Sequence, residues 1–79
     1  MTLMQAVSAR LTQLLQEKNM TLNQLFLQSG VPKSTICNVL GCSYSSVKLR
    51  VLHEMCQGLY IELAEFFASP LFKEENLEP

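Results

Sequence analysis

The segment Ser29–Leu40, SGVPKSTICNVL, carries side chains that could recognise a polar surface by hydrogen bonding. In a helix of about 100° per residue, its apolar residues share one side and its small polar residues share the other. The polar side displays Lys33, Ser34, Thr35, Cys37 and Asn38. Asparagine can bind adenine through two hydrogen bonds and lysine can donate to guanine, so this side suits base edges in a major groove. On the helix alone, an ordinary solvated face remains the simpler interpretation.

The side chains that could bind a metal are Cys37, Cys42, His53 and Cys56, which together have the composition of a zinc site. Helical periodicity places Cys37 on an outer face and Cys56 in a core stripe, so the four should not converge. We therefore predict no metal site, a core position for Cys56 and a solvated His53. Three cysteines without a secretion signal fit reduced thiols in the cytoplasm.

The chain lacks the residues for most enzymatic chemistry. It has no aspartate and a single histidine, which excludes Ser-His-Asp triads and leaves little material for general acid–base work. It also has no glycine-rich phosphate loop. We predict that the protein is not an enzyme, needs no cofactor and has no small-molecule ligand.

Charge is distributed unevenly along the chain. Residues 18–53 contain Lys18, Lys33, Lys48 and Arg50 and no acid, for +4, whereas residues 54–79 carry −5, within a total of −1. Such asymmetry is more informative than the total, and the basic middle indicates a partner such as nucleic acid. No apolar run approaches the roughly 18 residues of a membrane span, so no membrane partner is expected.

Periodicity and capping signals predict that these residues are positioned by short helices. The first helix spans residues 2–18 and opens with capping-box spacing between Thr2 and Gln5. The second spans residues 21–29 and opens with the same spacing, and the third spans residues 32–41.

The second half of the chain continues this helical pattern after a polar loop. Ser46 is predicted to cap a fourth helix, and a fifth covers residues 61–68, before Pro70. The predicted core stripe of the fourth helix consists of Leu49, Leu52, Met55, Cys56 and Leu59. With no competing strand pattern, the fold class is all-α. We expect the remaining residues to form a mobile acidic tail.

A tight turn at Gly30 joins the second and third helices into a helix-turn-helix pattern, with Leu25, Val31, Ile36 and Val39 facing inward. The stretches MTLNQLFLQSGVPKSTICNVL and VKLRVLHEMCQGLYIELAEFF closely resemble the phage-repressor type helix-turn-helix family, the Cro-like or XRE group of bacterial regulators. The resemblance covers about residues 5–68. It implies a five-helix, lambda-repressor-like domain that binds operator DNA as a dimer, with the third helix in the major groove.

Carried over by position, the resemblance implies two sets of contacts with duplex DNA. Base contacts are implied for Lys33, Ser34, Thr35, Cys37 and Asn38. Phosphate contacts near the start of the second and fourth helices are implied for Thr21, Asn23, Tyr44, Ser45, Ser46 and Lys48. Arg50, close behind Lys48, is a candidate for a further phosphate contact, and the alternative for it is a solvated charge on an exposed helix face. Free N–H groups and the positive helix end make such positions suitable for anions.

Several residues depart from the family pattern. Phe26 stands where the family generally has a small alanine, which lets the second and third helices pack closely, and Leu27 stands where a polar residue is usual. Cys42 and Tyr60 stand where relatives commonly have glycine. We therefore expect two turns to close differently, with Gly41 serving the first.

The chain is predicted to divide into a helix-turn-helix domain, residues 1–69, and an acidic C-terminal tail, residues 70–79. The end of the chain holds more apolar side chains than the core of so small a domain needs. We expect Phe67, Leu71 and Phe72 to contribute to a two-fold interface. Two reading helices one DNA turn apart would recognise a near-palindromic operator.

These features predict a small cytoplasmic transcriptional regulator, a repressor, that binds duplex DNA sequence-specifically as a homodimer. The alternative is a protein-interaction module on a helix-turn-helix scaffold, an antitoxin-like partner or adaptor with little or no DNA binding. Phe26, Leu27 and the sparse positive charge favour that alternative.

Overall fold

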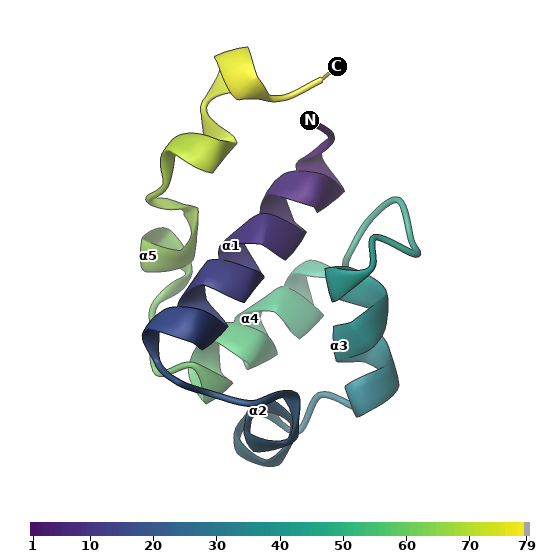
Figure 1. Cartoon of the computed structure of the whole chain (residues 1–79), viewed down its shortest axis with the longest axis vertical. Coiled ribbons are helices and arrows are strands. Elements are labelled where there is room, and N and C mark those ends of the chain that lie inside the picture. Colours follow the sequence, from purple (N-terminus) through teal and green to yellow (C-terminus); the bar gives the residue numbers. More distant parts are fainter. Residues whose placement is uncertain (79) are drawn as a thin grey trace.

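A computed structural model describes residues 1–78 and shows five helices followed by two 3₁₀ turns (Figure 1). The elements are α1 (Leu3–Glu17), α2 (Leu22–Ser29), α3 (Lys33–Leu40), α4 (Leu49–Gly58), α5 (Leu63–Phe67), η1 (Pro70–Phe72) and η2 (Glu74–Asn76). In Figure 1, α1 lies in front of α4, with α2 below, α3 to the right and α5 to the left. The predicted all-α, five-helix class is confirmed. Pro79, the last residue of the predicted tail, lies outside the described residues.

The first two helices begin as their local sequence predicts. Thr2 accepts a hydrogen bond from the backbone N–H of Gln5, whose side chain accepts one from the N–H of Thr2. Thr21 and Gln24 make the same reciprocal pair at the start of α2. Each capping residue satisfies an otherwise unpaired N–H and contributes on the order of 1 kcal/mol.

The first four helices are each followed by a residue with a left-handed backbone, and glycine supplies this residue only once, at Gly30 with φ 76°. The others are Asn19 (φ 50°), Cys42 (φ 54°) and Tyr60 (φ 60°). Gly41 stays helical with φ −86°, so the expectation that Gly41 closes the turn after α3 is wrong. Cys42 and Tyr60 instead adopt the conformation that glycine would. The backbone hydrogen bonds that close these three ends run from Met20 to Leu15, from Ser43 to Asn38 and from Ile61 to Cys56.

The fourth helix begins later than predicted. Lys48 is its N-cap and the helix starts at Leu49, so Ser46 does not cap it. The backbone of Lys48 is extended, with φ −64° and ψ 135°, so the helical conformation begins only after it. Val47, directly before Lys48, is partly buried and packs against the core. Leu49 was expected in the core stripe but is 68% exposed, because it lies at the open end of the helix.

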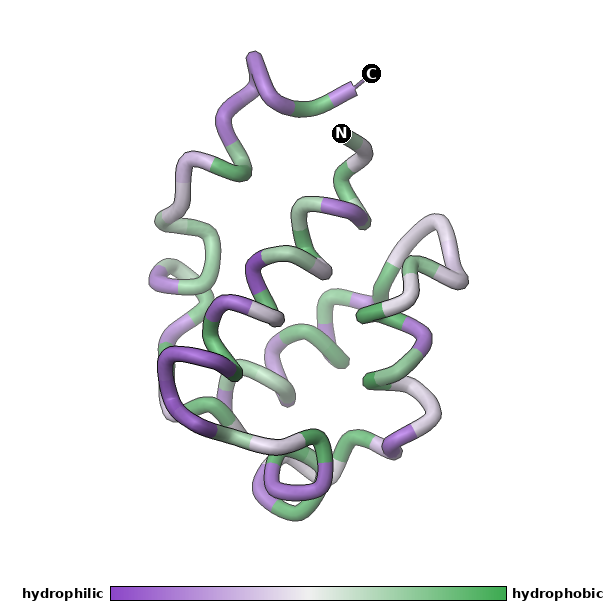
Figure 2. The backbone as a smooth tube through the Cα atoms, in the orientation of Figure 1, coloured by the Kyte–Doolittle hydropathy of each residue, from purple (hydrophilic) through white to green (hydrophobic). Residues whose placement is uncertain are grey.

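The core is a single apolar cluster to which α1–α5 all contribute. Figure 2 shows hydrophobic and hydrophilic residues alternating along these helices, as expected for helices with one buried face. The fully buried large side chains are Leu11, Leu14, Leu25, Ile36, Met55, Cys56, Leu59 and Phe66. None of the helices in residues 1–78 has the length and apolarity needed to cross a lipid bilayer.

The helix-turn-helix unit is held to the rest of the molecule by a close approach between α2 and α4. A side chain at Gly58 would place its Cβ 2.6 Å from the Cβ of Ser29. Real atoms do not approach so closely, so the absence of a side chain at Gly58 sets the distance between the two helices. Nothing in the local sequence pattern of α4 predicts this role.

The fifth helix is shorter than predicted, and Arg10 of α1 stabilises its C-terminal end. Nε of Arg10 donates to the carbonyl of Phe66, and a terminal guanidinium nitrogen donates to that of Glu65, both at 2.8 Å. The last carbonyls of a helix have no partner within it, and a cation there also complements the helix dipole. Arg10 thus fixes α5 against α1.

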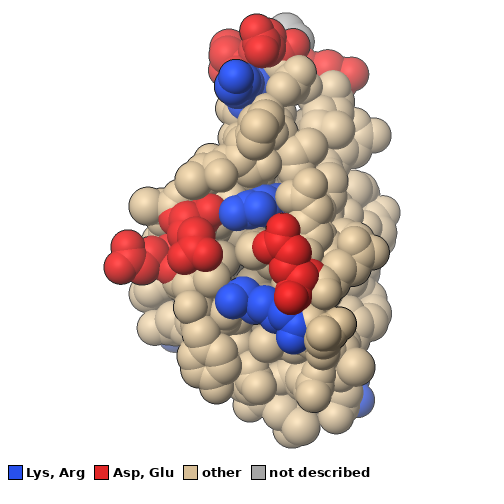
Figure 3. Space-filling view, turned by 60° about the vertical axis from the view of Figure 1, so that its left-hand side comes forward, with Lys and Arg blue, Asp and Glu red and all other residues tan. Residues whose placement is uncertain are grey.

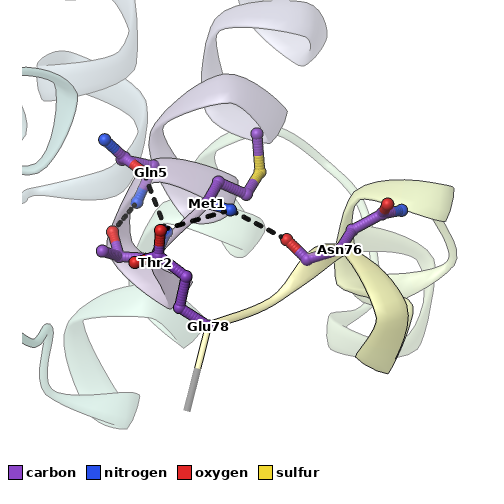
Figure 4. A network of polar contacts seen from close by, with 5 residues as sticks. All are labelled: Met1, Thr2, Gln5, Asn76 and Glu78. Carbon is purple, nitrogen blue, oxygen red and sulfur yellow. Dashed lines mark hydrogen bonds and ion pairs between the residues drawn. The ribbon is translucent and has the colours of Figure 1, made fainter.

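The C-terminal segment, residues 70–78, is folded back on the N-terminus, whereas the sequence predicts a mobile tail. Figure 4 shows the amino group of Met1 donating to the carbonyl of Asn76 at 3.0 Å and lying 3.9 Å from the carboxylate of Glu78. The N–H of Glu78 donates to the carbonyl of Met1 at 2.8 Å. Within the segment, the side chain of Asn76 donates to the carbonyl of Pro70. The contacts of Met1 with Asn76 and Glu78 could not be predicted because they join residues that are distant in sequence.

Candidate nucleic-acid interface

The polar side of α3 faces outward, as its periodicity predicts. Ile36 and Val39 are buried, whereas Lys33, Ser34 and Cys37 are exposed. Thr35 and Asn38 are partly buried. The hydroxyl of Ser8 in α1 donates to the carbonyl of Leu40 at 2.6 Å, which ties the end of α3 to α1. The five predicted base-contact residues therefore lie on one short, anchored helix.

The loop between α3 and α4 returns alongside α3 and meets its outer side. Nδ2 of Asn38 donates to the hydroxyl of Tyr44 at 3.2 Å. An asparagine amide has two N–H groups and a carbonyl oxygen, so one N–H and the oxygen of Asn38 remain for another partner. Those are the groups that bind the edge of adenine.

A groove lies between α3 and this loop, with a volume of about 490 Å³. It is lined by Thr35, Val39, Tyr44, Ser45, Ser46, Val47, Lys48 and Val51. The structure thus brings one predicted base-contact residue together with four predicted phosphate-contact residues. The valines on the groove floor were not predicted for the site, because their apolar side chains carry no binding signal in the sequence.

The N-terminal ends of α2 and α4 differ in what they can offer an anion. No side chain caps α4, so the N–H groups of its first turn are open at the edge of the groove, beside Lys48. At α2, the hydroxyl oxygen of Thr21 already accepts from the N–H of Gln24. Thr21 and Asn23 are exposed at that end, and Arg50 is exposed on α4, but neither helix end brings these three side chains into the groove.

Phe26 of α2 contacts the beginning of α3, a feature that the helix periodicity did not predict. Nζ of Lys33 lies 5.6 Å from the centroid of the Phe26 ring. Phe26 is itself partly buried and packs against the core. The bulky ring therefore stands at the edge of the α2–α3 junction. The sequence signal for this contact was the departure from the small residue usual at this position.

The cations of the candidate interface are free of carboxylates. Within residues 1–78 the sole ion pair joins the amino group of Met1 to Glu78, so Lys33, Lys48 and Arg50 are unpaired there. Figure 3 looks toward the side of the molecule that bears α5, where acidic side chains lie together with basic ones, as they also do over the C-terminal segment.

Two of the three predicted dimer residues, Phe67 and Phe72, form an aromatic cluster with the fully buried Phe66. The ring centroids of Phe67 and Phe72 are 4.9 Å apart, and Phe67 lies 5.3 Å from Phe66. Phe67 is 39% exposed, whereas Leu71 and Phe72 are partly buried. Most of the surface of these rings is therefore buried by contacts within the chain, and Phe67 is the most exposed of the three rings.

Family membership follows from both the sequence and the fold. The sequence pattern of the Cro/C1-type HTH DNA-binding domain matches residues 10–69, which is most of the chain. The chain belongs to this family, as the resemblance in the sequence indicates, and is accordingly a DNA-binding protein of the regulator type. No curated protein matches the sequence.

Solved structures support the same fold. The wild-type restriction-modification controller protein C.Esp1396I is similar with a TM-score of 0.77 and 24% sequence identity, over 85% of this chain and 87% of that one. A tyrosine-to-phenylalanine mutant of that protein gives a TM-score of 0.76 and 25% identity, over 85% of this chain and 86% of the mutant chain. This likeness establishes the architecture and leaves the residue roles to be argued from the site.

Proposed function

We propose that this protein is a transcriptional repressor that reads duplex DNA with α3 in the major groove. The observation that supports this proposal most strongly is that the polar side of α3 faces outward beside the uncapped N-terminus of α4, in a chain of the Cro/C1-type family. Lys33, Ser34 and Asn38 read bases, with Thr35 and Cys37 next to them. The first turns of α2 and α4, together with the α3–α4 loop, hold phosphates on either side. The wild-type controller protein C.Esp1396I, of similar fold, is by its name a regulator of restriction and modification.

The repressor acts as a homodimer on a near-palindromic operator. One eight-residue reading helix spans few base pairs, and a second copy related by two-fold symmetry doubles the sequence that is read. Phe67 is the best-placed of the predicted interface residues because it is the most exposed of them. It borders a small apolar groove that also includes Leu3 and Leu49, both exposed.

Selection from a random pool of duplex DNA tests the proposal directly. Wild-type protein should retain a near-palindrome with half-sites about one helical turn apart. A double variant, Lys33→Glu with Asn38→Ala, should lose this enrichment while keeping its thermal unfolding temperature. Lys73→Glu is the matched control, since it makes the same charge change on the C-terminal segment and should retain the motif.

The interaction-module alternative predicts the opposite pattern. Leu27 is 68% exposed on α2 and would be the natural anchor for a protein partner. DNA binding by the repressor should survive Leu27→Glu, whereas a module that works through this surface should lose its partner. Absence of any retained DNA at low salt would reject the repressor proposal. For the dimer, Phe67→Glu should shift the mass measured by analytical ultracentrifugation from two chains to one.

A further inference from the structure

The contact between Phe26 and Lys33 joins the scaffold to one of the proposed base-reading side chains. Phe26 belongs to α2 and packs against the core, so its ring is held in place. Lys33 is the first residue of α3 and is exposed. The 5.6 Å between Nζ of Lys33 and the ring centroid is within the range of a cation–π interaction.

The Phe26 ring offsets an unfavourable electrostatic environment of the Lys33 ammonium. A lysine at the start of a helix lies near the positive end of the helix dipole, which disfavours its charge there. No carboxylate within residues 1–78 pairs with Lys33 to offset this repulsion. The negative face of the Phe26 ring is thus the compensating group that the structure supplies. Without it, a long flexible side chain would be free to sample many rotamers in solvent.

We propose that Phe26 is a positioning residue, which holds the Lys33 ammonium in place for base recognition and thereby sharpens the base preference at the position that Lys33 reads. The inference rests on the proposed DNA-reading function. Restricting a side chain before binding reduces the conformational entropy lost on binding. Phe26 stands outside the predicted set of DNA contacts and acts through Lys33.

The experiment compares Phe26→Leu with Phe26→Tyr. Leucine keeps an apolar side chain against the core and removes the ring, whereas tyrosine keeps the ring. Each variant, wild type and Lys33→Met are put through selection from the random duplex pool, and Lys33→Met identifies the base position that Lys33 reads. Phe26→Leu should reduce the preference at that position by about two- to fivefold, and Phe26→Tyr should retain it.

A double-mutant comparison separates positioning from packing. In the Lys33→Met background, Phe26→Leu should cause no further loss of preference, because there is no ammonium left to position. A loss of the same size in both backgrounds would show a packing role and overturn the proposal. So would an unchanged preference in Phe26→Leu. Thermal unfolding of each variant confirms that the compared proteins are folded.

A measurement without DNA distinguishes failure of this proposal from failure of the proposed function. In the NMR spectrum, the ε-methylene protons of Lys33 should be shifted upfield by the ring, and Phe26→Leu should abolish the shift. If wild type enriches no motif, the DNA-reading function fails and the positioning role fails with it, whatever the NMR shift. If wild type enriches a motif but the shift is absent, the positioning proposal alone is rejected.

Discussion

Cys42 and Tyr60 adopt a backbone conformation that is unfavourable for residues with a side chain. Their φ angles are 54° and 60°, and each follows the end of a helix where the next N–H closes the turn. The left-handed conformation costs a non-glycine residue about 1–2 kcal/mol. The two side chains differ in the contacts that could offset this cost. Sγ of Cys42 donates to the carbonyl of Met4 at 3.7 Å, whereas the Tyr60 side chain is 77% exposed. Tyr60 is therefore the better position for testing the backbone strain, because its side chain has fewer contacts to lose.

Replacement of Tyr60 by glycine should stabilise the protein. Relief of the left-handed strain exceeds the extra entropy that glycine loses on folding, for a net gain of about 0.5–1 kcal/mol. Thermal unfolding should therefore shift upward by a few degrees. Tyr60→Ala is the control, because it removes the ring and keeps the strain. A lower unfolding temperature for the glycine variant would mean that the tyrosine side chain contributes more than its exposure suggests.

Cys56 should be unreactive in the folded protein, in contrast to the other two thiols. Burial in the core raises the pKa of its thiol from 9.0 to about 11, which keeps the reactive thiolate scarce. Cys37 and Cys42 are exposed. At pH 8, mass spectrometry after brief treatment with a maleimide should find two labels on native protein and three after denaturation. Because the unfolded thiol ionises at lower pH than the folded one, stability should also fall as the pH rises from about 9 to 11.

The pairing of α2 with α4 decides how the helix-turn-helix unit is presented. The end of α2 at Ser29 lies directly against Gly58 of α4. Ser29 also accepts the N–H of Val31 and donates to the carbonyl of Leu25, so this corner is rigid. A change in the distance between the two helices would move α3 with α2.

Gly58→Ala should therefore destabilise the protein even though alanine favours helices. Its Cβ would lie 2.6 Å from the Cβ of Ser29 and 2.9 Å from Ser29 backbone atoms, so the helices would have to separate. Forced expansion of a packed contact costs about 1–3 kcal/mol, measurable by urea unfolding. Gln57→Ala, at the neighbouring exposed position, should be close to neutral. Equal stability of the two variants would show that the α2–α4 contact adapts freely.

Charge is distributed unevenly over the folded molecule. The basic residues of the candidate interface lie on α3 and α4 or directly beside them. Most acids of the C-terminal half lie near α5 and in the C-terminal segment, which docks on the N-terminus (Figure 4), but Glu54 lies on α4 and basic side chains stand among the acidic ones in Figure 3. A dimer would bring few cations to DNA, namely Lys33, Lys48 and Arg50 from each chain. Affinity should consequently depend on hydrogen bonding and shape more than on ion pairing.

The salt dependence of DNA binding should therefore be shallow. With Lys33 on bases, Lys48 and Arg50 of two chains give four cationic phosphate contacts and a slope of log K against log salt of about −4, at roughly 0.9 per phosphate contact. Lys48→Gln should reduce the slope by about 2 for a dimer, whereas Lys73→Gln on the C-terminal segment should leave it unchanged. A wild-type slope of about −9 or steeper, which corresponds to ten phosphate contacts, would show that the interface extends well beyond the residues named here.

Features set by neighbours in the chain could be predicted from the sequence. The capping boxes at Thr2 and Thr21, the left-handed end at Gly30 and the two sides of α3 follow from contacts within one helical turn. These local signals also carry the family resemblance, so the five-helix class and the outward polar side of α3 were predictable from them.

Features that join distant residues were decided by the tertiary structure. Val47 packs against the core before α4 begins, Arg10 donates hydrogen bonds to the end of α5, and the C-terminal segment folds onto Met1. The contact between Phe26 and Lys33, one of the proposed base-contact residues, was also decided by the tertiary structure, because the two side chains meet only when α2 and α3 pack together. Helical periodicity specifies which side of a helix is buried. Which residues of other helices it meets depends on how the helices pack, and that is settled only when the whole core forms.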